Sequence, residues 1–231
     1  TISVVKNLLP ASPTIGDNTF CQNSDGILKA SAATGNSLLW YGTNASGGTS
    51  SAAAPSLSTA DTTTKYYYVS QQNTTTGCES PRAKITVKIN PIPSSPVVRD
   101  TAYCLNSSVD TLKAVNTTGN SLLWYGTAAS GGEGSSLGNV PNTKTAGTLS
   151  YYVSQKTTST GCEGPRAKIN VIINPLPSAP SVKDTAYCQN GTSDTIRITP
   201  SSGSTIVWYG NSETGGTASV VAPKPSTSTV G

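Results

Sequence analysis

An internal repeat with a period of 84 residues constrains the fold of this chain more than any other feature of its sequence. Residues 36–48, NSLLWYGTNASGG, return almost unchanged at 120–132 and in a weaker form, STIVWYGNSETGG, at 204–216. Trp40, Trp124 and Trp208 consequently stand 84 residues apart. Such a period indicates several copies of one structural unit, each of which contacts mainly its neighbours.

A longer segment and a proline-rich joint follow the same period. The segment YYVSQQNTTTGCESPRAKITVKIN begins at Tyr67, and YYVSQKTTSTGCEGPRAKINVIIN begins at Tyr151. Each is followed by a joint, NPIPSSP or NPLPSAP, in which proline fixes φ and removes hydrogen-bond donors. The sequence therefore predicts four parts: residues 1–9 as the last strand of an upstream repeat, 10–92 as repeat one, 93–176 as repeat two, and 177–231 as a partial repeat three.

Each repeat consists of short alternating segments separated by turn residues. In repeat one, Leu38 and Trp40 share one face of a predicted strand, and Ile85, Val87 and Ile89 share one face of another. Such period-two patterning over several short runs predicts an all-β fold of tandem immunoglobulin-like β-sandwiches. A single mid-domain tryptophan is the usual core anchor of such a sandwich. We therefore expect the three tryptophans, Trp40, Trp124 and Trp208, to be the core anchors.

Five cysteines recur at a fixed phase of the repeat, which indicates an oxidising compartment. No CxxC pair and no histidine are present, so the pattern does not fit a zinc site. A repeat of this length has only a modest core, and a covalent cross-link is expected. We predict disulfides within each repeat, Cys21–Cys78 and Cys104–Cys162, with the partner of Cys188 beyond residue 231. The rival scheme, Cys78–Cys104 and Cys162–Cys188, would join neighbouring repeats and stays open.

Composition and charge exclude several classes of function. The 15 basic and 11 acidic residues give a net charge of +4, and no basic run exceeds two residues, which argues against nucleic-acid binding. No apolar stretch approaches the length of a membrane span. Without histidine or a cluster of acids, we expect neither enzyme activity nor a cofactor. No DxDxDG-like segment occurs, so we expect no metal site.

The strand that carries each tryptophan also predicts an outward-facing surface. If Leu38 and Trp40 point inward, Leu39 and Tyr41 should point outward, next to Tyr68 of the adjacent strand. A loop or neighbouring repeat could cover this surface, or it could bind a ligand by stacking on sugar rings. The candidate contact face comprises Leu39, Tyr41, Tyr68, Leu123, Tyr125, Tyr152 and Tyr209.

The motifs LLWYG…GG, YYVSQ…GCESPRAKITV and YC at this spacing resemble the immunoglobulin-like repeats of very large Bacteroidetes surface proteins. Such proteins are typically exported by the type IX secretion system. Many are similar to adhesins, stalks or gliding-associated filaments, and some are multimodular enzymes that use the repeats as spacers. The resemblance implies an extracellular, cell-surface location reached by export across the outer membrane.

A second resemblance concerns glycosylation. The Bacteroidetes O-glycosylation signal, an Asp followed by Ser or Thr and then by an apolar residue or Thr, is similar to several Asp-Thr segments here. The alternative is that Asp-Thr starts strands and forms hydrogen bonds with the local backbone. The candidate threonines are Thr62, Thr101, Thr111, Thr185 and Thr195.

The leading functional hypothesis is a structural stalk or filament shaft that extends a distal functional tip, of adhesin or gliding/attachment type. The alternatives are a module that binds polysaccharide or a surface through its tyrosine-bearing face, and a spacer within a secreted multimodular enzyme. The expected partners are neighbouring repeats of the same chain, with other copies in a filament or a polysaccharide as further possibilities. Residues 1–9 could also donate a strand to another copy.

Overall fold

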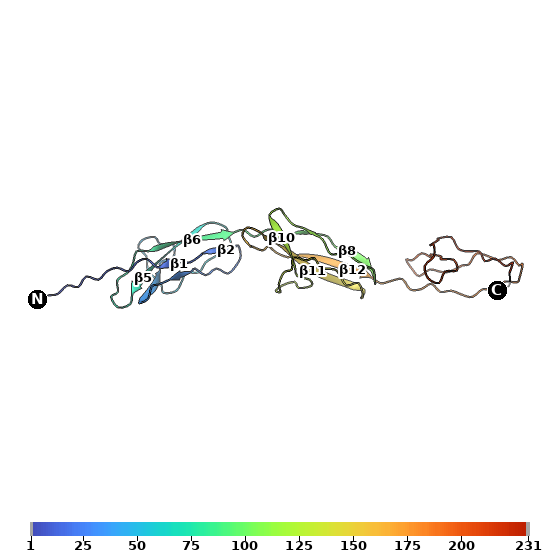
Figure 1. Ribbon diagram of the computed structural model, residues 1–231, viewed down its shortest axis with the longest axis horizontal. Coiled ribbons are helices and arrows are strands. Elements are labelled where there is room, and N and C mark those ends of the chain that lie inside the picture. Colours follow the sequence, from blue (N-terminus) through green and yellow to red (C-terminus); the bar gives the residue numbers. More distant parts are fainter. Residues whose placement is uncertain (1, 230–231) are drawn as a thin grey trace. The chain divides into compact units, whose positions relative to one another are not determined.

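The computed structural model describes residues 2–229, and over this range it contains strands and turns but no helix. All the named strands lie in the first two repeats (Figure 1). Repeat one contains β1 (Thr14–Ile15), β2 (Thr19–Cys21), β3 (Ala30–Ser31), β4 (Asn36–Trp40), β5 (Lys65–Asn73) and β6 (Ala83–Asn90). Repeat two contains β7 (Val97–Val98), β8 (Thr101–Cys104), β9 (Ala114–Val115), β10 (Asn120–Trp124), β11 (Gly147–Thr157) and β12 (Ala167–Asn174).

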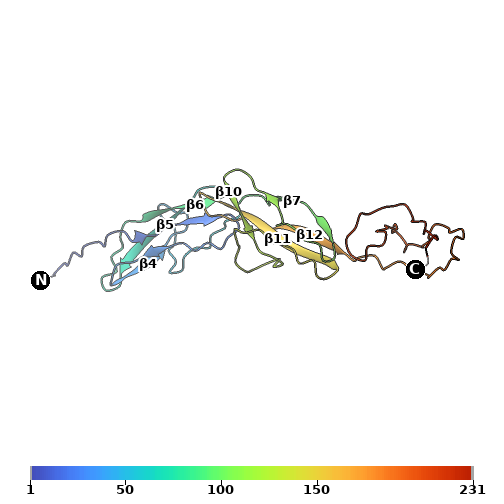
Figure 2. The same cartoon turned by 45° about the vertical axis from the view of Figure 1, so that its right-hand side comes forward.

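The two repeats share one topology, which confirms the predicted tandem all-β organisation. In repeat one a four-stranded sheet of order β2-β6-β5-β4 accompanies the two-stranded sheet β1-β3. Repeat two has the corresponding sheets β8-β12-β11-β10 and β7-β9, and its long strands are visible in Figure 2. Strand β5 is antiparallel to both of its neighbours, whereas β2 lies parallel to β6. The parallel pair sets Cys21 opposite Asn90, at the last residue of β6.

The core of each repeat lies between its two sheets and is built from the inward positions of the long strands. In repeat one it comprises Leu28, Trp40, Tyr67, Val69, Ile85, Val87 and Ile89, each less than a tenth exposed. The equivalent buried residues of repeat two are Leu112, Trp124, Tyr151, Val153, Ile169, Val171 and Ile173. This alternation follows from the two-residue period of a strand, which turns every second side chain toward the facing sheet.

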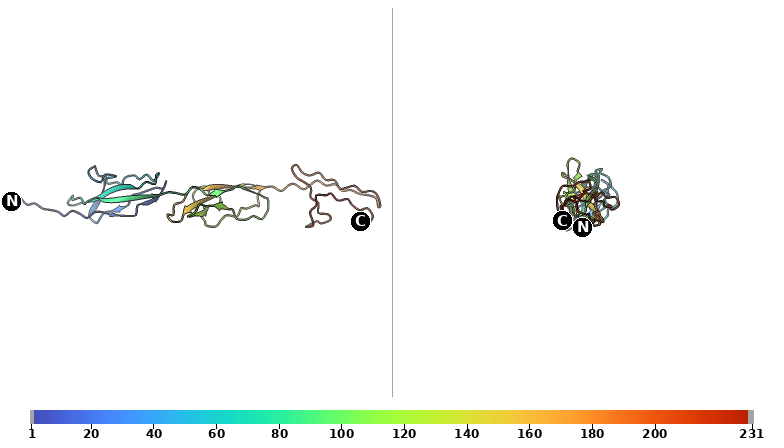
Figure 3. Two further views of the ribbon diagram at one scale, coloured as in Figure 1. Left: turned by 90° about the horizontal axis from the view of Figure 1, so that it is seen from above. Right: turned by 90° about the vertical axis from the view of Figure 1, so that its right-hand side faces the viewer.

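Repeat three differs from the first two over its described residues. From 175 to 229 the backbone forms only isolated bridges, Ser181 with Thr199 and Trp208 with Ser219, and the chain winds as irregular loops (Figure 3). By contacts the chain divides into two compact units. The first holds most of repeats one and two up to Ile172, and the second holds the residues after it together with 103–107 and 143–147.

Candidate functional site

A polar cluster surrounds the tyrosine that follows the core tryptophan. The hydroxyl of Tyr41 donates to Glu79 Oε1 at 2.6 Å, and the hydroxyl of Ser70 donates to the same oxygen at 2.6 Å. These donors, Ser70 first and Tyr41 second, lower the pKa of the Glu79 carboxyl, and the charge of Arg82 acts in the same direction. The Arg82 guanidinium lies 3.3 Å from the centre of the Tyr41 ring and donates to the carbonyls of Asn44 and Gly47.

Repeat two builds the same cluster from its own residues. Tyr125 and Ser154 both donate to Glu163 Oε1 at 2.5 Å, and Arg166 lies 3.3 Å from the centre of the Tyr125 ring. Burial, and then the hydrogen bond to Glu163, raise the pKa of Tyr125. The cluster therefore ties the strand end at the tryptophan to the hairpin that carries the Glu and the Arg.

The expectation that Tyr41 points outward is wrong, and a β-bulge explains the error. Tyr41 N donates to Tyr68 O, but Tyr68 N donates to Gly42 O, so two residues of one strand oppose a single residue of the other. Gly42 has φ +59°, a left-handed conformation that glycine adopts readily. The bulge interrupts the alternation and turns Tyr41 toward Glu79, so only 7% of Tyr41 is exposed.

The other members of the predicted contact face do not form an open apolar surface in the two complete repeats. Tyr125, which follows the equivalent bulge, and the remaining four residues of the two repeats, Leu39, Tyr68, Leu123 and Tyr152, are half-buried. Tyr209 in repeat three is 48% exposed. Tyr41 and Tyr125 of the predicted face thus belong to hydrogen-bonded clusters in repeats one and two.

A buried glutamine fixes the first residues of each repeat to its core. Gln71 is 2% exposed; its Nε2 donates to Ala11 O at 2.6 Å, and its Oε1 accepts from Ala33 N at 2.7 Å. Gln155 repeats this arrangement with Ser94 O at 2.7 Å and Thr117 N at 2.8 Å. Sequence reasoning missed this clamp, although the glutamine recurs in the YYVSQ motif.

The turn after each strand-end cysteine is also repeated. Asn23, Asn106 and Asn190 adopt positive φ values of 58–63°, which asparagine tolerates better than most residues. In repeat one Asn23 N donates to Thr59 O, and Thr59 Oγ1 donates to Ser24 O. The equivalent threonines, Thr143 and Thr227, hold the other two turns in the same way. These hydrogen bonds fix the position of the cysteine that precedes each turn.

Among residues 2–229 the structure contains one disulfide, and neither predicted scheme included it. Cys21 of repeat one is bonded to Cys162 of repeat two, with a Cα–Cα distance of 5.5 Å and 141 residues between them in sequence. The predicted within-repeat bonds Cys21–Cys78 and Cys104–Cys162 are therefore wrong, and Cys162 is not bonded to Cys188. Cys78, Cys104 and Cys188 carry free thiols.

The length of β6 explains why the within-repeat bond does not form. Cys21 lies opposite Asn90, at the end of β6, whereas Cys78 lies in the turn before β6 and accepts from Asn73 N. The seven residue steps from Ala83 to Asn90 span about 23 Å at ~3.3 Å per residue. A disulfide requires Cα atoms closer than about 7 Å. The two cysteines of one repeat therefore lie at opposite ends of it.

The cysteine partner comes from the next repeat because its hairpin packs against the joint. Gln155 donates to Ser94 O, and a Cβ at Gly164 would lie 2.1 Å from Pro93 O. Both contacts place the β11–β12 hairpin against the first residues of repeat two, directly after β6. Cys162 is fully buried there. The bond from Cys21 thus crosses the proline-rich joint.

The predicted core anchors differ between the complete repeats and repeat three. Trp40 and Trp124 are 5% and 4% exposed. Trp208 is only half-buried, and it pairs with Ser219 through two backbone hydrogen bonds of 2.8 and 2.9 Å. In repeats one and two the tryptophan strand is paired with β5 or β11, and the described part of repeat three has no such strand.

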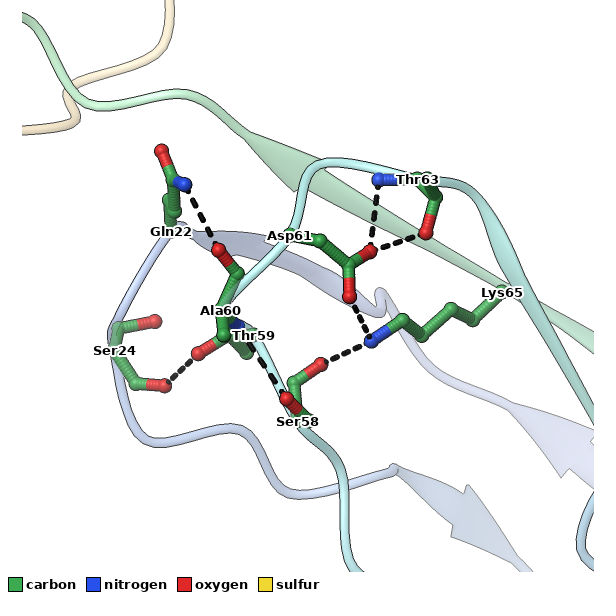
Figure 4. A network of polar contacts seen from close by, with 8 residues as sticks. All are labelled: Gln22, Ser24, Ser58, Thr59, Ala60, Asp61, Thr63 and Lys65. Carbon is green, nitrogen blue, oxygen red and sulfur yellow. Dashed lines mark hydrogen bonds and ion pairs between the residues drawn. The ribbon is translucent and has the colours of Figure 1, made fainter.

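The five candidate glycosylation threonines stay predictions. Thr62, Thr111, Thr185 and Thr195 are exposed, and Thr101 is half-buried. Thr62 lies in a loop organised by Asp61, which accepts hydrogen bonds from Thr63 and pairs with Lys65 at 3.2 Å (Figure 4). The Thr63 hydroxyl is the largest cause that lowers the pKa of Asp61. The local hydrogen bonding thus also fits the structural interpretation of the Asp-Thr segment.

Within residues 2–229, no group of three or more His, Cys, Asp or Glu side chains could hold a metal ion. No helix that could cross a membrane occurs in the same range. The carboxylates whose pKa values are lowered, Asp61, Glu79 and Asp100, each accept hydrogen bonds from neighbouring side chains or backbone.

Comparison with known protein families identifies the family to which the chain belongs. The family described as Ig-like domain CHU_C associated matches residues 10–91 and again 93–175. The chain belongs to this family. The two matches are the two complete repeats, and domains of this Ig-like kind are typically non-catalytic. The coarse role that follows is that of a structural repeat or spacer.

No curated protein matches the chain. Among solved structures, the four immunoglobulin domains of Sidekick-1 match at 16% identity, with a TM-score of 0.25, over 80% of this chain and 57% of that one. The chain thus spans little more than half of the Sidekick-1 structure. Murine CEACAM1b matches at 11% identity, with a TM-score of 0.28, over 71% of this chain and 99% of that one.

Proposed function

We propose that this chain is a shaft segment of a secreted, surface-anchored repeat protein of adhesin or gliding/attachment type. In this role the Ig-like repeats set length and transmit tension to a distal functional tip. The observation that carries the proposal is the disulfide from Cys21 to Cys162, which bonds one repeat covalently to the next. A binding domain does not require such a bond, whereas a segment under tension gains strength from it.

The disulfide defines a short covalent path for tension. A pulling force that enters before Cys21 can pass through the disulfide to Cys162 and leave through β12. The residues between the two cysteines cannot extend while the bond is closed. With 141 residues of separation and at most ~3.5 Å per residue, the bond withholds roughly 490 Å of contour length.

Single-molecule stretching of the whole chain tests this role. We expect the oxidised chain to reach a final extension roughly 490 Å shorter than the same chain after reduction. The double variant Cys21→Ser, Cys162→Ser should behave like the reduced chain under both conditions. Equal extensions for oxidised and reduced chain would show that the disulfide does not carry the load, and the proposal would lose its main support.

The alternative of a polysaccharide-binding face is less favoured, because Tyr41, one of its predicted tyrosines, is buried and hydrogen-bonded. A glycan array on the whole chain is still informative. A shaft should give no saturable binding, and saturable binding to one glycan class would favour the alternative. A spacer in a secreted multimodular enzyme would bear tension in the same way, and the sequence of the whole gene distinguishes it from an adhesin.

The proposed location follows from the redox chemistry of the bond. Structural disulfides persist mainly in oxidising environments, such as the periplasm and the outside of the cell. We therefore propose that the chain acts outside the cell after export across the outer membrane. Reduction of intact cells with a membrane-impermeant reductant, followed by a membrane-impermeant thiol reagent, should label Cys104, which is exposed. Labelling only after lysis would contradict this location.

A further inference from the structure

The free Cys104 occupies the same structural position as the bonded Cys21. Each cysteine is the last residue of the strand that pairs with the final strand of its repeat. The residue after each cysteine makes the same backbone hydrogen bond: Gln22 N donates to Asn90 O at 2.8 Å, and Leu105 N donates to Asn174 O at 2.8 Å. The turns that follow also agree, with φ +61° at Asn23 and +63° at Asn106. Cys104 therefore stands at the joint that leads into repeat three, as Cys21 stands at the joint that leads into repeat two.

The free Cys78 likewise matches the bonded Cys162. Asn73 N donates to Cys78 O, and Thr157 N donates to Cys162 O, each at 2.9 Å. Both cysteines follow a glycine with φ near +72° in the turn of the long hairpin. The chain thus contains two kinds of half-site, a strand-end cysteine and a hairpin cysteine, and the observed disulfide joins one of each kind from successive repeats.

We propose that Cys104 is half of a second inter-repeat disulfide, whose other half is the hairpin cysteine that belongs to repeat three. By the same equivalence, Cys78 forms a disulfide with the strand-end cysteine of a repeat that precedes Pro10. The disulfides then form a continuous ladder in which each repeat is bonded to the next. This inference rests on the equivalence of the repeats and stands independently of the shaft function.

Repeat three contains a cavity that fits the hairpin carrying this cysteine. A cavity of about 690 Å3 is lined by residues that include Ser178, Ser201 and Tyr209. Ser178 and Ser201 are 84 residues after Ser94 and Thr117, whose backbone groups hold the buried Gln155 in repeat two. The cavity therefore lies where the YVSQ strand of such a hairpin would place its glutamine, next to the exposed Tyr209.

The bond can form without an added oxidant if the incoming cysteine arrives as a mixed disulfide with a small thiol. The Cys104 thiolate attacks the hairpin sulfur, a Cys104–hairpin disulfide forms, and the small thiol leaves with the electron pair and takes up a proton. Docking of the hairpin raises the effective concentration of the two sulfurs into the millimolar range. Cys104 should therefore react much faster than the other free thiols.

The test uses a synthetic hairpin with the sequence of Gly147–Asn174, whose cysteine is activated as a mixed disulfide with glutathione. It is added to the whole chain, in which Cys21–Cys162 is intact, and adducts are mapped by mass spectrometry. We expect the adduct on Cys104 to form at least tenfold faster than on Cys78 or Cys188. As a control, the rates at which oxidised glutathione alone reacts with the three thiols give their intrinsic reactivity. A hairpin carrying Gln155→Leu should lose most of the preference.

A second version of the experiment joins the hairpin to the chain and so avoids a free peptide. Residues Thr148–Asn174 are joined after Gly231, which is equivalent to Gly147, and the folding of repeat three is followed by the tryptophan emission, to which the buried Trp40 and Trp124 give a constant background. We expect the extended protein to show a blue-shifted Trp208 emission and a disulfide from Cys104 to the added cysteine. Equal labelling of the three thiols, a preference for Cys188, or a free Cys104 in the extended protein would each overturn the proposal. Saturable binding of the whole chain to one glycan class would count against the shaft function alone and would leave this proposal standing.

Discussion

Replacement of Tyr41 by phenylalanine isolates the hydrogen bond at the centre of the polar cluster. The hydroxyl donates to the Glu79 carboxylate at 2.6 Å, and the ring is 7% exposed. Phenylalanine keeps the ring volume and the contact with Arg82, so the core is undisturbed. Hydrogen bonds to charged groups contribute about 1.5–3 kcal/mol.

The lower end of that range applies, because Glu79 is partly exposed and keeps the Ser70 hydroxyl as a second donor. We therefore expect Tyr41→Phe to reduce the free energy of unfolding of repeat one by about 1.5 kcal/mol. This corresponds to a change of roughly tenfold in the unfolding equilibrium. Urea denaturation of the oxidised chain, followed by circular dichroism, measures the change.

Two comparisons make the measurement specific. Tyr68→Phe is the matched control, because no hydrogen bond of the Tyr68 hydroxyl occurs among the described residues, and its effect should stay within about 0.5 kcal/mol. A double-mutant cycle of Tyr41→Phe with Glu79→Gln should give a coupling energy of about 1 kcal/mol. Unchanged stability of Tyr41→Phe, or a coupling energy near zero, would refute the role assigned to this hydrogen bond.

Three further outcomes are expected. The pKa of Glu79 is lowered in the folded chain, so its contribution to stability is complete above its ordinary value of 4.5 and is lost as pH falls through the folded value. Urea midpoints measured from pH 7 to pH 3 should therefore fall, and Glu79→Gln should fall less. Gly164→Ala would drive a Cβ to 2.1 Å from Pro93 O and should cost about 1–3 kcal/mol, measured by urea denaturation. If the Asp-Thr segments are glycosylated, the intact mass of native material should exceed the 23.6 kDa of the bare chain.

Local patterns predicted the strands well, because strand alternation is encoded within a few residues. The inward positions Trp40, Val69 and Ile85 are all buried, as the two-residue period requires. The same rule failed one residue later, at Tyr41, because the bulge at Gly42 shifts the alternation. The WYG triplet, with a glycine directly after the tyrosine, was the available signal for that bulge.

The disulfide could not be predicted from spacing, since its partners depend on the direction of one strand pair. The parallel arrangement of β2 and β6 places Cys21 at the end of repeat one that adjoins the joint. An antiparallel arrangement would have brought Cys21 toward the turn that contains Cys78. Nothing in the 84-residue period distinguishes these arrangements, because both repeat equally well along the chain.

The hairpins of the two repeats differ at the position two residues after the hairpin cysteine. In repeat two, whose Cys162 is bonded, Gly164 lets the carbonyl of Pro93 approach to a distance that no side chain would permit. In repeat one the equivalent Ser80 has a side chain that accepts from Gln71 N and donates to Pro81 O. The glycine thus allows the hairpin to close tightly on the joint beside the inter-repeat bond. If so, introducing Ser80→Gly should leave repeat one folded, while Gly164→Ser should slow formation of the Cys21–Cys162 bond during oxidative refolding. Refolding of Gly164→Ser at the rate of the unmodified chain would separate the glycine from the disulfide.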